Sequence, residues 1–263
     1  MAEHAPPLVF AVLAWWFSTG AILWLVRGSQ QRTRWSLLLG GLGAAAALVG
    51  LAVTARDPST WGAYAAFGCA LAVWGWHEAS FLTGWITGPR RTASPPGLSG
   101  WSRFCVASET VMHHEVALAA TGLAIVALTW GAPNQTGALT FGLLFFLRLS
   151  AKLNIFLGVA NPPTALLPEP IVHLASYFRR RPMNPLLPLS LAASAATAAL
   201  FAWGALRPEA GAGEQAGMTL LFAMAALGLL EHAFLTAPSP ERALWGWALG
   251  RRSKPLAMAA RKP

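Results

Sequence analysis

The chain has 263 residues, of which 55% are hydrophobic and only 11% are charged. Soluble domains carry about 25% charged residues, so this composition excludes an ordinary soluble protein and indicates an integral membrane protein. The formal net charge of +9 at pH 7 is also found in nucleic-acid-binding proteins. Here, however, no module combines aromatic with basic residues, and the basic residues concentrate in alternate loops. We therefore expect no nucleic-acid partner and interpret the charge as a topology signal.

Seven apolar stretches are long enough to cross a bilayer, which takes about 20 apolar residues in a helix. They are 7–26, 35–55, 61–87, 104–130, 138–159, 186–206 and 217–237. The first has no basic segment before it and no small-residue cleavage site after it, so we expect a retained span and not a secretory signal. The sequence thus predicts an all-α, polytopic membrane protein with about seven transmembrane helices in one membrane-embedded domain, 1–263.

Lys and Arg are distributed unequally between alternate loops. The loops after the first, third and fifth predicted spans, with the tail after Pro238, hold fifteen of the nineteen basic residues. The loops on the opposite side hold only Arg56 and Arg207. Because cytoplasmic loops are enriched in Lys and Arg, we expect a periplasmic N-terminus, a cytoplasmic loop at 161–185 and a cytoplasmic tail at 238–263.

The predicted cytoplasmic loop contains a stretch, 171–181, that follows four prolines and ends in three arginines. Two conformations are open: a short amphipathic helix at the membrane surface, or an irregular loop whose arginines contact anionic lipid head groups. The predicted face for partners or lipid comprises Arg90, Arg91, Arg179, Arg180 and Arg181. The tail combines Trp245 and Trp247 with a basic end, so we expect it to lie on the membrane or to dock on a partner.

Ionisable side chains interrupt four of the predicted spans at a similar depth. At about 1.5 Å per helical residue, they lie roughly 7 to 17 Å inside the cytoplasmic edge of the membrane. This polar layer comprises His77, Glu78, Glu109, His113, His114, Glu115, Arg148, Lys152, Glu231 and His232. A charged group at such depth costs roughly 2.5 to 3.5 kcal/mol on insertion scales, so these residues should pair or line a site. Any chemistry is expected in this layer.

Spacing adds detail to the polar layer. Glu109 and His113 are four residues apart, as are Arg148 and Lys152, so each pair is expected to share one face of a helix. The adjacent His113 and His114 cannot both point into one site along a regular helix. Only one of the two histidines is therefore expected to act as a ligand.

Three interpretations of the polar layer are open. In a charge-compensated structural network, two fixed cations face four glutamates, so a glutamate should be protonated, a histidine charged or a cation bound. In a ligand site, neutral imidazole would bind bacteriochlorophyll or haem, with carboxylates orienting the ligand. The tetrapyrrole site would use His77, His113, His114 or His232 as axial ligand, with Arg148 or Lys152 for a pigment carboxylate. In a proton or ion pathway the groups would relay charge, but the outer halves of the spans carry almost no ionisable residues.

Catalytic motifs are absent from the sequence. It contains no HExxH, histidine box, Glu-x-x-His pair, nucleophile elbow, phosphate loop or dinucleotide fingerprint. Cys69 and Cys105 lack the spacing of paired or metal-binding cysteines, which favours structural packing. Ser108 and Ser150 have the placement of helix-packing serines. We therefore expect that the protein is not an enzyme.

Several stretches along the chain form a distinctive combination. They are WWFSTG at 15–20, WGWHE at 74–78, SFLTG at 80–84 followed by GPRR at 88–91, WGAPNQ at 130–135, RLSAKLN at 148–154 and SYFRRRPMNP at 176–185. Together they resemble, nearly end to end, the photosynthetic complex assembly protein family PuhE of purple and related phototrophic bacteria.

The resemblance implies a multi-pass protein in the cytoplasmic or intracytoplasmic membrane of a bacteriochlorophyll-containing bacterium. It implies a role in building the reaction centre and its light-harvesting complex, with subunits of these complexes, other assembly factors and membrane lipid as partners. It carries over no catalytic residue and no cofactor. Two alternatives stay open: a membrane redox or pigment-modifying enzyme with a His- and Glu-lined intramembrane site, and a stable accessory subunit or scaffold.

Overall fold

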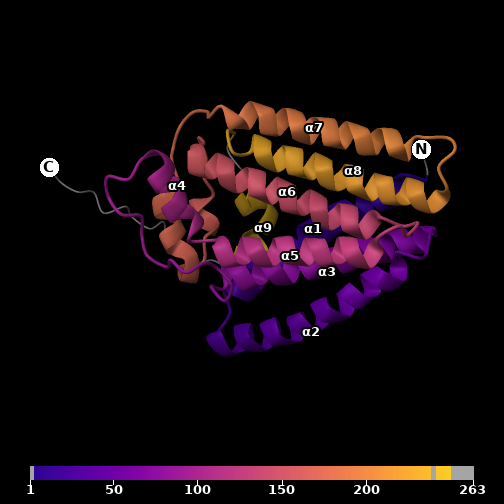
Figure 1. Cartoon of the computed structure of the whole chain (residues 1–263), viewed down its shortest axis with the longest axis horizontal. Coiled ribbons are helices and arrows are strands. Elements are labelled where there is room, and N and C mark those ends of the chain that lie inside the picture. The colour runs from indigo at the N-terminus through magenta and orange to yellow at the C-terminus, as the bar shows by residue number, and fades with distance from the viewer. Residues whose placement is uncertain (1–2, 238–240, 250–263) are drawn as a thin grey trace.

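The computed structural model describes residues 3–237 and 241–249, and this part of the chain is built from helices (Figure 1). The long helices are α1 (Ala5–Val26), α2 (Gln30–Thr54), α3 (Thr60–Leu82), α5 (Met112–Thr129), α6 (Thr136–Leu157), α7 (Leu186–Ala205) and α8 (Ala212–Ala233). The short elements are α4 (Gly100–Ser108), the 3-10 helices η1 (Thr164–Leu166) and η2 (Glu169–Tyr177), and α9 (Glu241–Leu249). The predicted all-α class is confirmed.

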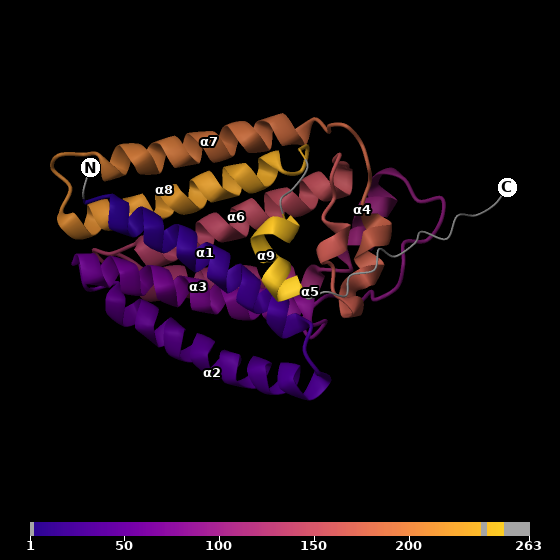
Figure 2. The same ribbon diagram turned by 180° about the vertical axis from the view of Figure 1, so that it is seen from behind.

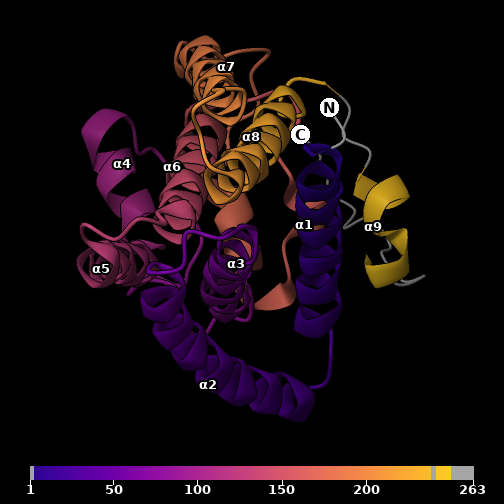
Figure 3. The same cartoon turned by 90° about the vertical axis from the view of Figure 1, so that its right-hand side faces the viewer.

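Six of the long helices, α1, α2, α5, α6, α7 and α8, are long and apolar enough to cross a membrane. The chain is therefore a polytopic membrane protein. The remaining long helix, α3, corresponds to the predicted span 61–87 but ends at Leu82. It runs through the middle of the bundle, in contact with α1, α2, α5, α6 and α8 (Figure 3). Because α3 faces protein on most sides, it can carry His77 and Glu78, both buried, within an otherwise apolar bundle.

The long helices alternate in direction, so their connections gather at two ends of the bundle (Figure 1). At one end, Asn134 fastens two connections together, because its backbone N–H donates to Ala55 O at 2.9 Å and its side-chain amide to Thr54 O at 3.0 Å. The opposite end carries α4 and η2, and we call it the α4–η2 end. The loops of the predicted cytoplasmic side meet there, including those with Arg90 and Arg179.

The expected span 104–130 is wrong as one continuous helix. α4 stops at Ser108, a turn follows, and α5 starts at Met112. The loop after α3 explains the break, since its Thr87 O accepts a hydrogen bond from His114 N at 2.8 Å in place of the helical carbonyl. The same loop passes so close that a Cβ on Gly88 would stand 2.0 Å from Glu109 O. A long-range backbone contact thus replaces the local helical pattern.

The break moves Glu109 out of the polar layer. Its carboxylate accepts a hydrogen bond from Arg90 Nε at 2.9 Å, and its side chain is 41% exposed. Glu109 and His113 lie on different elements, so the expected shared helix face does not exist. Glu109 is therefore part of a loop contact and not of the buried charge arrangement.

The stretch 171–181 forms neither a free amphipathic surface helix nor an irregular loop. Most of it belongs to η2, whose inward side chains Ile171 and Leu174 pack against Phe81 of α3. The end of η2 is held by Arg103 of α4, whose Nη2 donates to Tyr177 O at 2.6 Å. The apolar face of η2 is thus used inside the protein, where it covers the end of the bundle.

The aromatic part of the tail docks on the chain's own α1 (Figure 2). Trp16 Nε1 donates to Leu244 O at 2.9 Å, and Trp245 Nε1 donates to Trp16 O at 3.1 Å. Trp247 lies directly over Gly20, where an added Cβ would stand 2.1 Å from the indole. The two tryptophans therefore contact the chain's own α1, where the sequence predicted the membrane or a partner. The basic end at 250–263 lies outside the described residues.

The close packing at the start of α8 can be tested by substitution of a glycine. A Cβ on Gly213 of α8 would stand 2.0 Å from Pro58 O, a backbone atom that cannot swing away, whereas a Cβ on Gly142 of α6 would meet nothing within 4 Å. We expect Gly213→Ala to lower the free energy of unfolding by about 1 to 3 kcal/mol through overpacking. Gly142→Ala should be neutral or raise it by up to about 1 kcal/mol. Unfolding of both variants in one detergent measures this, and equal stabilities would contradict the packing at Gly213.

Candidate functional site

Two cations on α6 reach carboxylates on two neighbouring helices. Arg148 Nη2 donates to Glu78 Oε2 of α3 at 2.9 Å, and Lys152 Nζ donates to Glu115 Oε1 of α5. The four-residue spacing puts both cations on one face of α6. Lys152 Nζ also stands 5.0 Å from the centre of the Phe81 ring, within cation–π distance. These contacts tie α6 to α3 and α5 by charge, within the α4–η2 half of the bundle.

The charge count differs from the one expected from sequence. With Glu109 outside the layer, three glutamates face Arg148 and Lys152. Glu231 of α8 has no cationic partner among the described residues, and it accepts a hydrogen bond from Trp15 Nε1 at 2.9 Å. An indole N–H stabilises a carboxylate without neutralising it. Glu231 is thus the glutamate of the layer for which the described residues provide no counter-charge.

Two histidines lie near the ion pairs. His114 is fully buried, its ring centroid is 4.6 Å from that of Phe81, and neither ring nitrogen has a hydrogen-bond partner among the described residues. Its Nε2 is 3.8 Å from Glu78 Oε1, a distance too long for a hydrogen bond. His77 Nε2 is hydrogen-bonded to Thr121 Oγ1 at 3.0 Å. Both rings are embedded between helices.

The other two histidines are placed elsewhere. His113 is exposed on the outer face of α5, whereas His114 is buried. His232 of α8 has both ring nitrogens engaged, Nδ1 with Gly228 O at 2.8 Å and Nε2 with Ser150 Oγ at 3.0 Å. The structure therefore does not bring the four predicted histidine ligands together.

His232 belongs to a polar network that sequence reasoning missed. From Ser150 the network continues to Ser190 of α7, and Asn154 Nδ2 donates to Ser190 Oγ at 2.9 Å. Asn184 Nδ2 donates to Asn154 Oδ1 at 3.1 Å, while Asn184 Oδ1 accepts from the first backbone N–H groups of α7. Asn154 is the last residue of the stretch 148–154, and Asn184 is the last but one of 176–185. Their place in these distinctive stretches is the signal from which sequence reasoning could have found them. The network fixes α6, α7 and α8 together.

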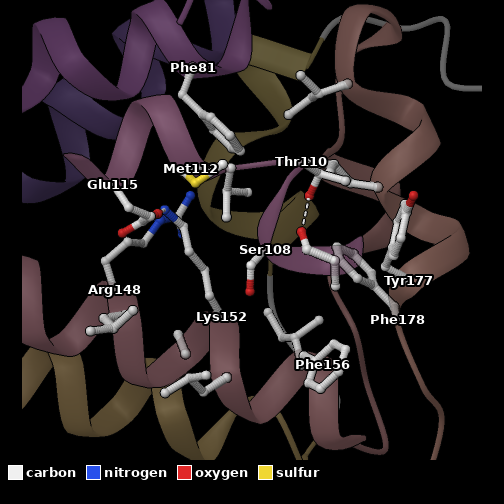
Figure 4. A pocket seen from close by; sticks show the side chains of 18 of the residues that line it. Phe81, Ser108, Thr110, Met112, Glu115, Arg148, Lys152, Phe156, Tyr177 and Phe178 are labelled. Carbon is white, nitrogen blue, oxygen red and sulfur yellow. Dashed lines mark hydrogen bonds and ion pairs between the residues drawn. The ribbon is translucent and has the colours of Figure 1, made fainter. Parts of the chain in front are cut away.

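A cavity of about 390 Å³ adjoins the ion pairs at the α4–η2 end (Figure 4). Its walls come from α3, α4, α5, α6 and η2 and are mainly apolar. They include Phe81, Phe104, Phe156, Ile171, Leu174 and Phe178. Glu115, Arg148 and Lys152 gather at one side of the cavity, and the aromatic rings of Phe156 and Phe178 stand at the other (Figure 4). We call this space the aromatic cavity.

A second cavity of about 280 Å³ lies on the other side of Arg148. It is bounded by α1, α3, α6 and α8 and is more polar, because Trp15, Ser18, Glu78 and Glu231 line it. Five residues line both cavities: Leu82, Arg148, Ala151, Pro163 and Leu167. The pair of Arg148 with Glu78 thus stands at the division between the two spaces.

Neither cavity has a histidine among its described lining residues. Within 3–237 and 241–249, no group of three or more His, Cys, Asp or Glu side chains could hold a metal ion. Of the predicted tetrapyrrole-site residues, only Arg148 and Lys152 face a cavity, and each is already paired with a carboxylate. The arrangement can bind an apolar molecule beside paired charges more readily than it can ligate a metal.

The predicted basic face gathers at the α4–η2 end. Arg181 and Arg91 are exposed there, while Arg90 is engaged with Glu109. Burial lowers the pKa of Arg103, and the nearby Arg179 and Arg181 lower it further. Burial, together with Arg91, likewise lowers the pKa of His173 in η2. Arg103 thus lies close to Arg179 and Arg181, and His173 lies close to Arg91, so like charges gather at this end.

Comparison with known proteins gives one family and one relative. The family described as "Protein of unknown function (DUF3623)" matches residues 1–256. A protein of Rhodobacter capsulatus, named "Uncharacterized 30.4 kDa protein in puhA 5'region", is 40% identical over 246 residues, covering 90% of this chain and 88% of the relative. No solved structure is significantly similar to the chain.

Glu78 and Glu231 give a matched pair of variants. Glu78→Gln leaves Arg148 without its counter-charge, whereas in Glu231→Gln an amide oxygen still accepts from Trp15. Breaking a fully buried pair costs about 3 to 5 kcal/mol, and the Arg148 side chain is 40% exposed, so we expect Glu78→Gln to lose about 1 to 3 kcal/mol. Glu231→Gln should lose less than about 1 kcal/mol.

Unfolding in one detergent measures both variants. Adding Arg148→Met to Glu78→Gln should recover part of the loss, because it removes the unpaired cation. Equal losses in the two single variants would show that the Glu78–Arg148 pair does not stabilise the bundle.

Proposed function

We propose that this chain, which belongs to the DUF3623 family of proteins of unknown function, assists the assembly of photosynthetic complexes in the bacterial membrane. The observation that carries the proposal is the 40% identity to the Rhodobacter capsulatus protein named for the 5′ region of puhA, a photosynthesis gene region. The resemblance to the PuhE assembly family supports the same role. The expected partners are reaction-centre or light-harvesting subunits and other assembly factors.

Two features of the bundle surface support a role that works through contacts with other proteins. α2 presents a row of exposed apolar side chains along its outer face, including Trp35, Leu39, Leu42 and Val49. In a membrane such a face can contact either lipid or another helix. The basic groups at the α4–η2 end can contact polar segments of a partner or anionic head groups. Helix contacts and a basic face are together sufficient for an assembly factor, without a catalytic group.

Axial ligation of a tetrapyrrole is not part of the proposal, because the placement of the histidines does not fit it. His232 has no free ring nitrogen, and His113 points away from the bundle. His77 and His114 do not line either cavity, and the His114 ring packs against Phe81, which leaves no room for a macrocycle. The assembly role does not depend on a ligated pigment.

Deletion of the gene in a bacteriochlorophyll-producing host separates assembly from pigment chemistry. We expect severalfold less assembled reaction-centre and light-harvesting complex, and no accumulation of a pigment intermediate, because contact with subunits is lost while pigment synthesis continues. Native gels of solubilised membranes measure the complexes, and chromatography of extracted pigments measures the intermediates. Accumulation of an intermediate would favour the pigment-modifying enzyme, and unchanged complexes would refute the assembly role.

Two exposed arginines at opposite ends of the bundle test the proposed basic face. Arg181 lies at the α4–η2 end and Arg56 at the other end. We expect Arg181→Gln to reduce recovery of partner subunits with the affinity-purified protein about two- to fivefold, as loss of one interfacial charge contact of about 0.5 to 1 kcal/mol would. Arg56→Gln should leave recovery unchanged. Equal recovery with both variants would place the partner surface elsewhere.

A further inference from the structure

We propose that the aromatic cavity is a binding site for a neutral amphiphile with one long apolar chain, isoprenoid or acyl, that enters from the bilayer. Its head group would lie beside the two ion pairs and its chain between the aromatic walls. This inference does not rest on the assembly role, because it concerns a cavity inside one molecule and not a partner surface. Its support comes from the walls, the mouth and the charges of the cavity.

The walls of the aromatic cavity exist because of the break between α4 and α5. Ser108, Thr110 and Val111, at the break, all line the cavity. A continuous helix over 104–130 would keep Phe104 on the axis of α5, whereas α4 stands apart from α5 in the structure (Figure 1). The space so opened is covered by η2, not filled by side chains. An apolar space of this size suits an apolar chain, since apolar surface is buried favourably there.

The mouth of the aromatic cavity faces the lipid side of α5. Met112 and Val116 line the cavity and are also 44% and 61% exposed on the outside of the bundle. Both are apolar and both belong to a helix that is apolar enough to cross a membrane. A ligand passing them therefore comes from the hydrocarbon region, and a bilayer-soluble molecule is the class that reaches this opening.

The charges beside the aromatic cavity select a neutral head group. Each cation already has a carboxylate partner, so neither is free to balance the charge of an anionic ligand. A further carboxylate would stay without a counter-charge in a region of low dielectric, which is costly. A hydroxyl, carbonyl or ester oxygen adds no charge. It can also accept a hydrogen bond from Arg148, whose Nε is buried without a partner among the described residues although the side chain is 40% exposed.

A preference for a neutral head group differs from the role that the sequence predicted for Arg148 and Lys152, which was to bind a pigment carboxylate. As free cations they would suit a pigment carboxylate, but as partners of Glu78 and Glu115 they form neutral pairs. Neutral pairs offer N–H donors without attracting an anion strongly. The preferred ligand is therefore an alcohol, ester or ketone with a long chain, and its free acid should bind less well.

Photocrosslinking in phosphatidylcholine nanodiscs tests the site with two probes of equal chain length. One is geranylgeraniol with a diazirine at the end of the chain remote from the hydroxyl, and the other is geranylgeranoic acid with the diazirine at the same place. The full-length protein is labelled, digested and mapped by mass spectrometry. We expect the alcohol to label residues of α4, η2 and the end of α6. The acid should label them severalfold less, because neither cation is free to pair with its carboxylate.

A variant that fills the aromatic cavity, called the plug variant, and a matched control test whether the labelling comes from the cavity. Ala151 lines both cavities, whereas Ala119 is exposed on α5 and faces lipid. Ala151→Phe should lower cavity labelling by the alcohol about tenfold, corresponding to about 1.4 kcal/mol of lost binding. Ala119→Phe should leave it unchanged. If Ala151→Phe fails to fold, as judged by gel filtration and melting, Ala107→Phe fills the cavity from α4 instead.

Two outcomes overturn the inference. Labelling concentrated on the outer face of α2, with equal yield in wild type and the plug variant, would mean that the probe only solvates the protein as lipid. Acid labelling as strong as alcohol labelling would refute selection of a neutral head. Either result leaves the assembly role standing, because that role is judged by the amount of assembled complex.

Discussion

The bundle depends on the neutralisation of charge inside a membrane protein. A single unpaired ion in hydrocarbon costs several kcal/mol, so Arg148 and Lys152 are tolerable on α6 only because carboxylates from α3 and α5 meet them. That requirement fixes three helices in rotation and in height. It also explains why α3, the carrier of Glu78, lies in the middle of the bundle and not at its surface (Figure 3). The ionic contacts specify the arrangement more than they add to its stability.

Much of this arrangement could be predicted from the sequence. The apolar stretches gave the long helices, because length and hydropathy decide which segments suit a bilayer. Position along alternating helices also put Glu78, Glu115, Arg148 and Lys152 at one level, since rise per residue is constant. The four-residue spacing on α6 then gave the shared face of the two cations.

What could not be predicted depended on contacts between distant segments. The break before α5 is made by backbone groups of the loop at Thr87 and Gly88, and no local pattern in 104–130 indicates it. The depth of a residue in the membrane does not determine how its helix is rotated about its own axis. The sequence therefore could not predict which of His113 and His114 would point inward. The hydrogen bond of His232 could likewise not be predicted, because its partner Ser150 lies 82 residues away in the chain.

The stretches that carry the family resemblance, apart from 130–135 at the opposite end of the bundle, meet at the same part of the molecule. Stretch 15–20 and stretch 74–78 line the second cavity, 148–154 supplies the cations that separate the two cavities, and 176–185 contributes to the wall of the aromatic cavity. The stretch 88–91 supplies the close contact that breaks the helix before α5. A family defined by helix surfaces alone would place its characteristic residues on outward faces. Here most of them lie around the two cavities, so the stretches that resemble the family belong to the interior of the α4–η2 half as well as to its surface.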